Sequence, residues 1–331
     1  MGKTLQYHSL TPSYRFIDYA TQGYVAVVGL LVLGFHGGKV GGWGWLVGAH
    51  VVCLGVVHGI IRWHARRPGN PVAAALRHFY PILLYTFLYA ETGHLNQMFT
   101  GRAEVFYADA VFLRLEQQLF GCQPTLALME RMPWLWLSEL LYASYFSYYF
   151  MIFGVGLALF LRDRRQFFHY VSVVSFVFYF CYLVYIFFPV VGRPIFFEEI
   201  TGHPLPPEVL PAEPLSYPAS VQAGPFYQLM AFIYERCETP GAAFPSSHVA
   251  VALCTVYFSF RYLRPIRYVH LTVAVLLCIA TVYCRYHYVV DVLAGALTTL
   301  VLVPIANRLC LRFPSGTLCE TESPPAQSRV V

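Results

Sequence analysis

Eight apolar segments, each long enough to cross a bilayer as a helix, recur along this chain and limit what it can fold into. A transmembrane helix needs about 20 mostly apolar residues, because only helices and closed barrels satisfy the backbone inside lipid. The segments are residues 19–35, 43–61, 76–92, 137–160, 167–188, 246–263, 267–283 and 288–307. Charged residues make up 12% of the chain, where a soluble domain carries about 25%. We therefore predict an all-α, polytopic transmembrane helix bundle with about eight spans.

The basic residues between these segments predict an orientation. With a cytoplasmic N-terminus, 15 of the 22 Lys and Arg residues fall on the inner side, including every short basic loop (RWHARR, RDRR and RYLRPIR). Positive residues favour cytoplasmic loops, so we expect both termini inside. The net charge of +5 comes from these short clusters rather than from one basic patch. No nucleic-acid partner is expected.

The same pattern divides the chain into three parts. We expect an N-terminal transmembrane pair (1–75), a membrane domain (76–307) and a cytoplasmic tail (308–331). In the stretch EVFYADAVFLRLEQQLFG (104–121), apolar residues at helical spacing predict either an amphipathic helix at the outer interface or an ordinary packed loop helix. The segment 196–241 contains eight prolines and no long apolar run. It predicts an extracytoplasmic loop over the bundle.

Three polar clusters fall on the predicted outer side. FPVVGRPIFF follows the fifth segment, FPSSHVA opens the sixth, and CRYHYVVDVLAG opens the eighth. Composition by itself does not place three such clusters on one face. They therefore predict an extracytoplasmic active site.

The third cluster contains a histidine and a carboxylate four residues apart. On a helix, His287 and Asp291 share a face about one turn apart. The carboxylate can hold the proton of one imidazole nitrogen, which leaves the other nitrogen free to act as a nucleophile. The alternative is an interfacial histidine with a helix-capping partner. Ionisable residues at membrane depth are costly, which favours the functional interpretation.

The second cluster, Pro-Ser-Ser-His, has the pattern of a helix start. Ser246 or Ser247 is a candidate N-cap, and the backbone N–H groups of a helix start can bind a phosphate. His248, in the first turn, can donate a proton to a departing oxygen. The alternative is a plain N-cap with a bystander histidine. In the first cluster, Arg193 before a proline offers a guanidinium suited to phosphate oxygens.

Two further residues are candidates for a headgroup pocket. Glu91 and His94 lie three residues apart near the outer end of the third segment, where they either line that pocket or form a helix-end hydrogen bond. The residues His248, His287 and Asp291 form a poor zinc site, because they come from separate elements and include no cysteine. We expect neither a metal nor another cofactor.

The three clusters resemble the motifs of the type 2 phosphatidic acid phosphatase superfamily, which end in Arg-Pro, read Pro-Ser-x-His and end in His-x-x-x-Asp. The resemblance implies a phosphohistidine on His287, oriented by Asp291, with His248 as general acid. The phosphate-binding residues that it implies are Arg193, Ser246 and Ser247.

Two positions depart from that pattern. The first motif normally has Lys where this chain has Ile186, and the third has Ser-Arg where it has Ala280-Thr281. Arg285 and Arg236 are candidates to replace the missing charge. These reduced motifs are similar to the inositolphosphotransferase branch that includes the inositolphosphorylceramide synthases, as are the upstream stretches LEQQLFGCQP and LYASYFSYYF. The resemblance covers roughly residues 76–307.

Together, the residues and the resemblance lead us to expect a metal-independent phosphotransferase. It would move a phosphoryl-linked headgroup from a membrane lipid to a lipid, alcohol or polyol acceptor. The alternative is a lipid phosphate phosphatase, in which water attacks the phosphohistidine. A non-catalytic transporter or structural membrane protein is the remaining alternative.

Overall fold

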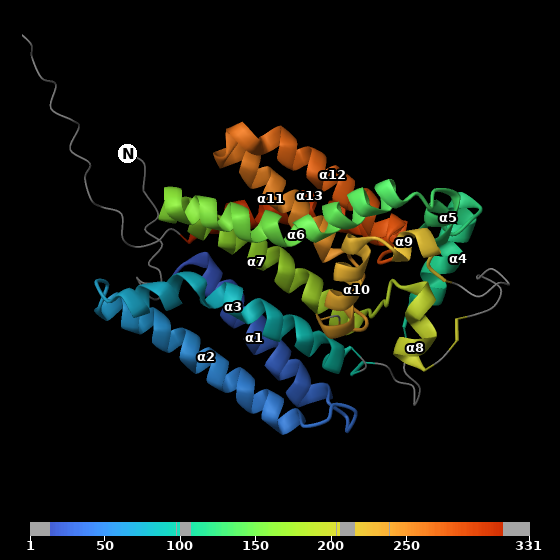
Figure 1. Cartoon of the computed structure of the whole chain (residues 1–331). Coiled ribbons are helices and arrows are strands. Elements are labelled where there is room, and N and C mark those ends of the chain that lie inside the picture. The colour runs from blue at the N-terminus through green and yellow to red at the C-terminus, as the bar shows by residue number, and fades with distance from the viewer. Residues whose placement is uncertain are drawn as a thin grey trace, which may run out of the picture.

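The computed structural model of the protein describes residues 14–96, 98–99, 107–202, 204–205, 216–237 and 239–313 (Figure 1). Most of this part of the chain is helical, and its one β feature is an isolated parallel bridge between Val190 and Ala242. The prediction of an all-α architecture is therefore confirmed over the described residues.

Each of the eight predicted segments coincides with a long helix. The long helices are α1 (Phe16–Phe35), α2 (Trp43–Arg66), α3 (Pro71–Leu95), α6 (Leu135–Arg162), α7 (Arg164–Phe187), α11 (Ser247–Tyr262), α12 (Arg267–Tyr283) and α13 (Val289–Arg312). Within the described residues, six helices are long and apolar enough to cross a membrane: α1, α2, α6, α7, α13, and α12 with the turn that precedes it. Polar residues lower the hydropathy of α3, and α11 has only 16 residues. These helices fit an integral membrane protein.

Local sequence signals set several helix ends. Asn70 caps α3 by accepting a hydrogen bond from the Ala73 N–H at 2.9 Å, and Pro71 takes the first helical position, where no N–H is needed. Asp163 separates α6 from α7 and accepts a bond from the Arg165 N–H at 2.7 Å. These short polar stretches interrupt apolar sequence that would otherwise continue as helix.

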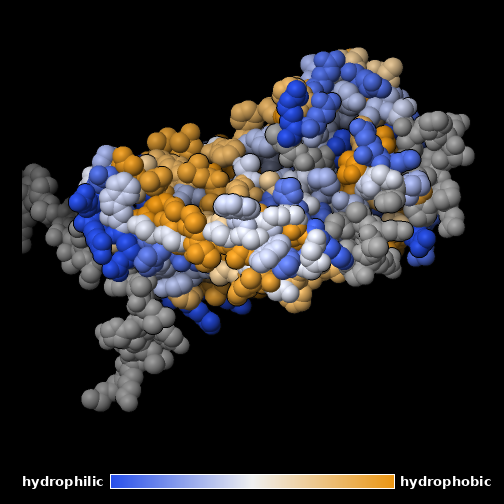
Figure 2. Space-filling model, turned by 90° about the horizontal axis from the view of Figure 1, so that it is seen from below, coloured by the Kyte–Doolittle hydropathy of each residue, from blue (hydrophilic) through white to orange (hydrophobic). Residues whose placement is uncertain are grey.

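Helix α7 forms the centre of the bundle. It contacts α1 and α3 on one side and α6, α11 and α13 on the other (Figure 1). Helix α2 contacts α1 and α3 and is mostly exposed, with apolar side chains such as Val51 and Val52 each 64% exposed. Exposed apolar surface of this extent is what a lipid-facing helix presents. On the face shown in Figure 2, apolar residues gather along the middle and hydrophilic residues toward the ends.

Among the described residues, five short α-helices gather at one end of the bundle, the end at which α11 and α13 begin (Figure 1). They are α4 (Asp109–Phe120), α5 (Pro124–Arg131), α8 (Phe197–Thr201), α9 (Ala219–Gln222) and α10 (Pro225–Cys237). The predicted helix over 104–121 corresponds to α4. Within its described part, the segment 196–241 contains short helices where the sequence predicts a loop, and two of its prolines, Pro218 and Pro225, stand at helix starts. Pro225 begins α10, and Glu139 of α6 caps that helix by accepting a bond from the Phe226 N–H at 2.9 Å.

Candidate active site

Three loops converge at this end of the bundle, and each carries one of the polar clusters. The first two pair as a short parallel bridge, in which the Ala243 N–H donates to the Val190 carbonyl at 2.9 Å. The second joins the third through a bond from the Ser246 N–H to the Asp291 carbonyl at 3.1 Å. Clusters that lie up to about 100 positions apart in sequence are thereby fixed against one another by backbone bonds.

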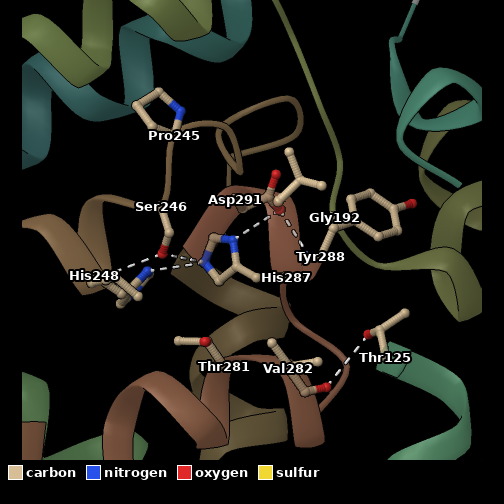
Figure 3. A network of polar contacts seen from close by, with 12 residues as sticks. Thr125, Gly192, Pro245, Ser246, His248, Thr281, Val282, His287, Tyr288 and Asp291 are labelled. Atoms are coloured by element: carbon tan, nitrogen blue, oxygen red, sulfur yellow. Dashed lines mark hydrogen bonds and ion pairs between the residues drawn. The ribbon is translucent and has the colours of Figure 1, made fainter. Parts of the chain in front are cut away.

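His287 lies at the centre of this junction, between a carboxylate and a second histidine (Figure 3). Its Nδ1 is 3.4 Å from Oδ2 of Asp291, and its Nε2 is 3.4 Å from Nδ1 of His248 and 3.2 Å from Oγ of Ser246. Asp291 is fully buried and also accepts a bond from the Tyr288 N–H at 2.9 Å. This arrangement places one imidazole nitrogen against a carboxylate and turns the other toward a second imidazole.

Burial keeps His287 uncharged. The side chain lies in the loop between α12 and α13, and desolvation lowers the pKa of His287 to about 3. A neutral imidazole has a free lone pair on one nitrogen, which a nucleophile requires. The geometry and the protonation state therefore agree with a nucleophilic role for Nε2.

The start of α11 supplies the polar groups next to His287. Ser246 is its N-cap and accepts a bond from the Val249 N–H at 3.4 Å. The Ser247 N–H donates to the Tyr185 hydroxyl at 3.2 Å, and that hydroxyl donates to the Pro245 carbonyl at 3.0 Å. The predicted N-cap is thus present, and the positive end of α11 faces the junction.

A cavity of about 530 Å³ opens from this junction into the bundle. His248 and His287 lie at one end of it, and α3, α6, α7 and α10 supply most of its wall. Its lining is mainly aromatic: Tyr85, Tyr89, Phe146, Tyr148, Tyr149, Phe153, Phe178, Tyr182, Tyr234 and Tyr286. A cavity with an apolar wall and a polar end suits an amphiphilic molecule.

Two tyrosines of α6 pack against the second histidine. The rings of Tyr145 and Tyr148 lie 4.9 Å and 4.5 Å from the His248 ring, measured between centroids. The stripe of tyrosines in LYASYFSYYF therefore contributes to the site as well as to helix packing. Helical spacing alone does not distinguish these two roles.

Arg193 lies beside the cavity. Its guanidinium carbon is 4.8 Å from the ring centroid of Tyr234 and 5.4 Å from that of Tyr286, and both rings line the cavity. The two rings stack on each other with centroids 4.0 Å apart. Arg193 is half-buried, so this aromatic surface holds its charge next to the cavity.

The structure does not bring Arg285 to the cavity. Its guanidinium donates to the Ser216 carbonyl at 2.9 Å and to the Leu126 carbonyl at 3.3 Å, and it pairs with Glu130 at 3.2 Å. The guanidinium is therefore bonded to partners at and near α5, and Arg285 is not part of the cavity lining. Arg236, the other candidate replacement, is 59% exposed at the end of α10 and lies outside the cavity lining.

The predicted headgroup pair is also placed elsewhere. Glu91 is buried and pairs with His50 of α2, with 3.3 Å between Oε1 and Nε2, while His94 is exposed. Neither lines the cavity, because Glu91 and His94 follow Tyr89 by two and five positions, which places them on other sides of α3.

Sequence reasoning missed two carboxylates behind the loops that carry the polar clusters. Asp109 and Glu116 of α4 are fully buried, and both accept hydrogen bonds from the segments that flank His287. For the stretch that contains them, the sequence predicts either an amphipathic helix at the outer interface or an ordinary packed loop helix. The available signal in the sequence was that these two charged residues fall on the apolar face of that helix.

Comparison with known proteins gives one match. The model of the PAP2 superfamily matches residues 111–305, which is more than half of the chain. The matched region contains all three loops that carry the polar clusters and begins within α4, after α1, α2 and α3. No curated protein and no solved structure matches the chain.

Proposed function

The chain belongs to the PAP2 superfamily, and on this premise we propose that it is an integral membrane lipid phosphotransferase that acts through a phosphohistidine on His287. The observation that carries the proposal is the placement of His287, Asp291 and His248 at the end of a large aromatic cavity. This superfamily fits either a lipid phosphatase or a phosphotransferase, so the acceptor decides between them.

In the first step, Nε2 of His287 attacks phosphorus and the bond to the leaving oxygen breaks. Asp291 keeps the proton on Nδ1, which fixes the tautomer and stabilises the positive charge that develops on the ring. His248 donates a proton to the leaving oxygen. The start of α11 and Arg193 offset the negative charge of the phosphoryl oxygens.

In the second step, a hydroxyl group attacks the phosphohistidine. His248, now neutral, accepts the proton of that hydroxyl, and the phosphorus–nitrogen bond breaks to restore His287. With a phosphodiester donor and an alcohol or polyol acceptor, the product is a new phosphodiester. With a phosphomonoester donor and water as the acceptor, inorganic phosphate is released and the enzyme is a phosphatase. Neither step needs a metal, because the arginine and the helix start supply the positive charge.

The shape and lining of the cavity support a lipid donor. Its volume of about 530 Å³ and its aromatic wall suit an apolar chain, with the phosphate at the histidine end. Helices α3 and α6 both line the cavity and both pack against α7. A chain entering between α3 and α6 would reach His248 without leaving the membrane.

The charge beside the cavity favours a phosphodiester donor and thus the inositolphosphotransferase branch. None of the described residues that line the cavity is Lys or Arg, and Ile186 and Thr281 are buried apolar or neutral residues. A diester carries one negative charge, whereas a monoester carries up to two and needs more cationic partners. Arg193 alone matches the diester better.

The topology proposed with this function has eight spans, with α3 and α11 as membrane helices inside the bundle. Both termini lie in the cytoplasm and the active site on the opposite side, as the distribution of basic residues predicts. Labelling of a cysteine introduced at residue 220 from the outside of sealed cells tests this orientation. Labelling only after permeabilisation would contradict it.

The deciding experiment compares two donors with the full-length protein in lipid nanodiscs. One arm supplies a phosphomonoester lipid, and the other a phosphodiester lipid plus a labelled polyol. We expect transfer product from the diester, with turnover that resists chelators and is inhibited by vanadate. Inorganic phosphate released from the monoester without transfer product would establish the phosphatase instead. Absence of turnover on every lipid, with cellular activity intact in His287→Ala, would favour a non-catalytic protein.

A further inference from the structure

Helix α4 carries two buried carboxylates that bind the catalytic loops from behind. Asp109 and Glu116 are both 0% exposed, and they lie seven residues apart, about two helical turns. Neither lines the cavity that contains His287. A buried carboxylate costs free energy unless several donors satisfy it, so the partners of these two residues indicate what they do.

Asp109 joins the first loop to the third. Its Oδ2 accepts a bond from the Val191 N–H at 2.8 Å, and its Oδ1 accepts bonds from the Gly192 N–H at 2.9 Å and the Tyr288 hydroxyl at 2.9 Å. Gly192 immediately precedes Arg193, and Tyr288 immediately follows His287. One side chain therefore holds a neighbour of the arginine and a neighbour of the nucleophile.

Glu116 holds the start of the helix that carries Asp291. Its Oε1 accepts bonds from the N–H groups of Val289 and Val290, the first two residues of α13, the second at 3.3 Å. These are two of the N–H groups that a helix start leaves without partners, and a negative charge at that position is favourable. Asp291 follows directly in the same turn.

Close packing between the loops makes their register sensitive to these bonds. Gly192 has a φ of +75°, and a Cβ added there would lie 2.6 Å from Cβ of Ala243 and 2.8 Å from the Tyr286 carbonyl. Tyr288 is tied at both ends, because its N–H donates to Asp291 and its hydroxyl to Asp109. Movement of α4 would be transmitted through these bonds to the His287–Asp291 pair.

We propose that Asp109 and Glu116 are positioning residues that hold Arg193, His287 and Asp291 in register without touching the substrate. The proposal rests on the proposed function and assigns a role to a helix that none of the three motifs includes. A misplacement of about 1 Å at a reacting centre can cost on the order of 10² in rate. We therefore expect loss of either carboxylate to lower kcat far more than it changes KM.

Glu116 offers a matched pair of variants. Only Oε1 accepts the two N–H groups, while Oε2 has no hydrogen-bond partner among the described residues. In Glu116→Gln the amide oxygen can keep both bonds, whereas Glu116→Ala removes them. We expect Glu116→Ala to lower kcat by roughly 10- to 10²-fold with KM nearly unchanged, and Glu116→Gln to stay near wild type. A purely structural role would show as lost folded protein, without a change of kcat per folded molecule.

Tyr288→Phe provides a second variant that is expected to fold. It removes one hydroxyl and the bond to Asp109, and it keeps the ring that stacks on Phe112 with centroids 5.9 Å apart. Asp109→Asn places an amide N–H against one of the backbone donors and should show the larger effect. The expected order of kcat is wild type, then Tyr288→Phe, then Asp109→Asn.

The experiment measures kcat, KM and melting temperature for these four variants and for His287→Ala in nanodiscs. A second readout needs no substrate: the rate of carbethoxylation of His287, relative to exposed His94, followed by mass spectrometry. We expect Glu116→Ala and Asp109→Asn to lower this ratio and Glu116→Gln to preserve it. Equal values for Glu116→Ala and Glu116→Gln in both readouts, with Tyr288→Phe like wild type, would overturn the positioning role. Turnover that persists in His287→Ala would instead refute the proposed function, while the labelling ratio still tests the role of α4.

Discussion

The described part of the chain contains two buried pairs of a histidine and a carboxylate, and their distances are almost equal. His50 of α2 lies 3.3 Å from Glu91 of α3, and His287 lies 3.4 Å from Asp291 of α13. All four side chains are at most 4% exposed. By distance and burial alone, either pair qualifies as a functional site within a membrane protein.

The two pairs differ in what the second imidazole nitrogen meets. Nδ1 of His50 contacts the Leu46 carbonyl at 2.8 Å, so both nitrogens face protein partners, and the ring packs against Gly29. Nε2 of His287 instead faces Ser246 and His248 at the end of the cavity. A buried pair therefore indicates chemistry only where one nitrogen reaches a space that a substrate can enter.

The largest expected difference between the pairs is in turnover. His287→Ala removes the proposed nucleophile, and we expect activity to fall to background, a loss on the order of 10⁴-fold or more. His50→Ala should leave kcat within about threefold of wild type, because His50 does not reach the cavity, while lowering the melting temperature. Turnover of the labelled lipid by both variants, normalised to folded protein, checks this. Equal losses in the two would remove the distinction drawn between the pairs.

The next effect separates the proposed roles of the two histidines, His248 and His287. His248→Ala removes the proposed proton donor, so kcat should fall by roughly 10²- to 10⁴-fold. A donor lipid whose leaving group is a stronger acid needs less protonation, and it should restore part of the rate to His248→Ala. It should not restore His287→Ala, which lacks the nucleophile. Measuring both variants with both donors tests the assignment, and equal rescue would mean that the roles are exchanged or shared.

A smaller effect distinguishes the two arginines that the sequence offered for phosphate binding. Arg193 lies beside the cavity, whereas Arg285 is held by Glu130 and two backbone carbonyls. Loss of a charge-assisted contact to the phosphate should lower kcat/KM of Arg193→Ala by roughly 10- to 10²-fold. Arg285→Ala should lower the melting temperature and keep kcat/KM near wild type. Steady-state kinetics and thermal unfolding of both variants give the answer, and the reverse pattern would make Arg285 the phosphate ligand.

The elements that the sequence predicts well are those encoded within a short stretch. Long apolar runs bounded by signals such as Asn70-Pro71 give the long helices, and His287 and Asp291 are brought together simply by one turn of helix. The start of α11 is likewise encoded by consecutive residues, with Ser246 as the cap.

What the sequence does not predict depends on partners far away in the chain. Asp109 meets Tyr288, 179 positions later, and Arg285 meets Glu130, 155 positions earlier. The pairing of Glu91 with His50 depends on how α2 packs against α3. A sequence specifies the type of each residue, but it does not say which of several distant polar groups will contact it. The contacts of Arg285 and Glu91 could therefore be assigned only once the fold was known.

The smallest effect concerns the pH dependence of stability, to which His287 and Glu116 contribute in opposite directions. Burial raises the pKa of Glu116 to about 7 from an ordinary 4.5, against the opposing effect of its two backbone bonds. The unfolded chain therefore releases this proton at lower pH than the folded protein, and stability should fall as pH rises from about 4.5 to about 7. His287 acts in the opposite direction, because its folded pKa of about 3 lies below the ordinary 6.5, so its contribution rises with pH over that interval.

Comparing wild type with Glu116→Gln cancels the contribution of His287 and leaves that of Glu116. The amide has no proton to release, so the melting temperature of Glu116→Gln relative to wild type should rise between pH 4.5 and pH 7. Thermal unfolding of the two proteins in the same detergent, at intervals across this range, measures the difference. Parallel curves would mean that Glu116 ionises as it does in the unfolded chain, and that its burial behind the start of α13 carries no electrostatic cost.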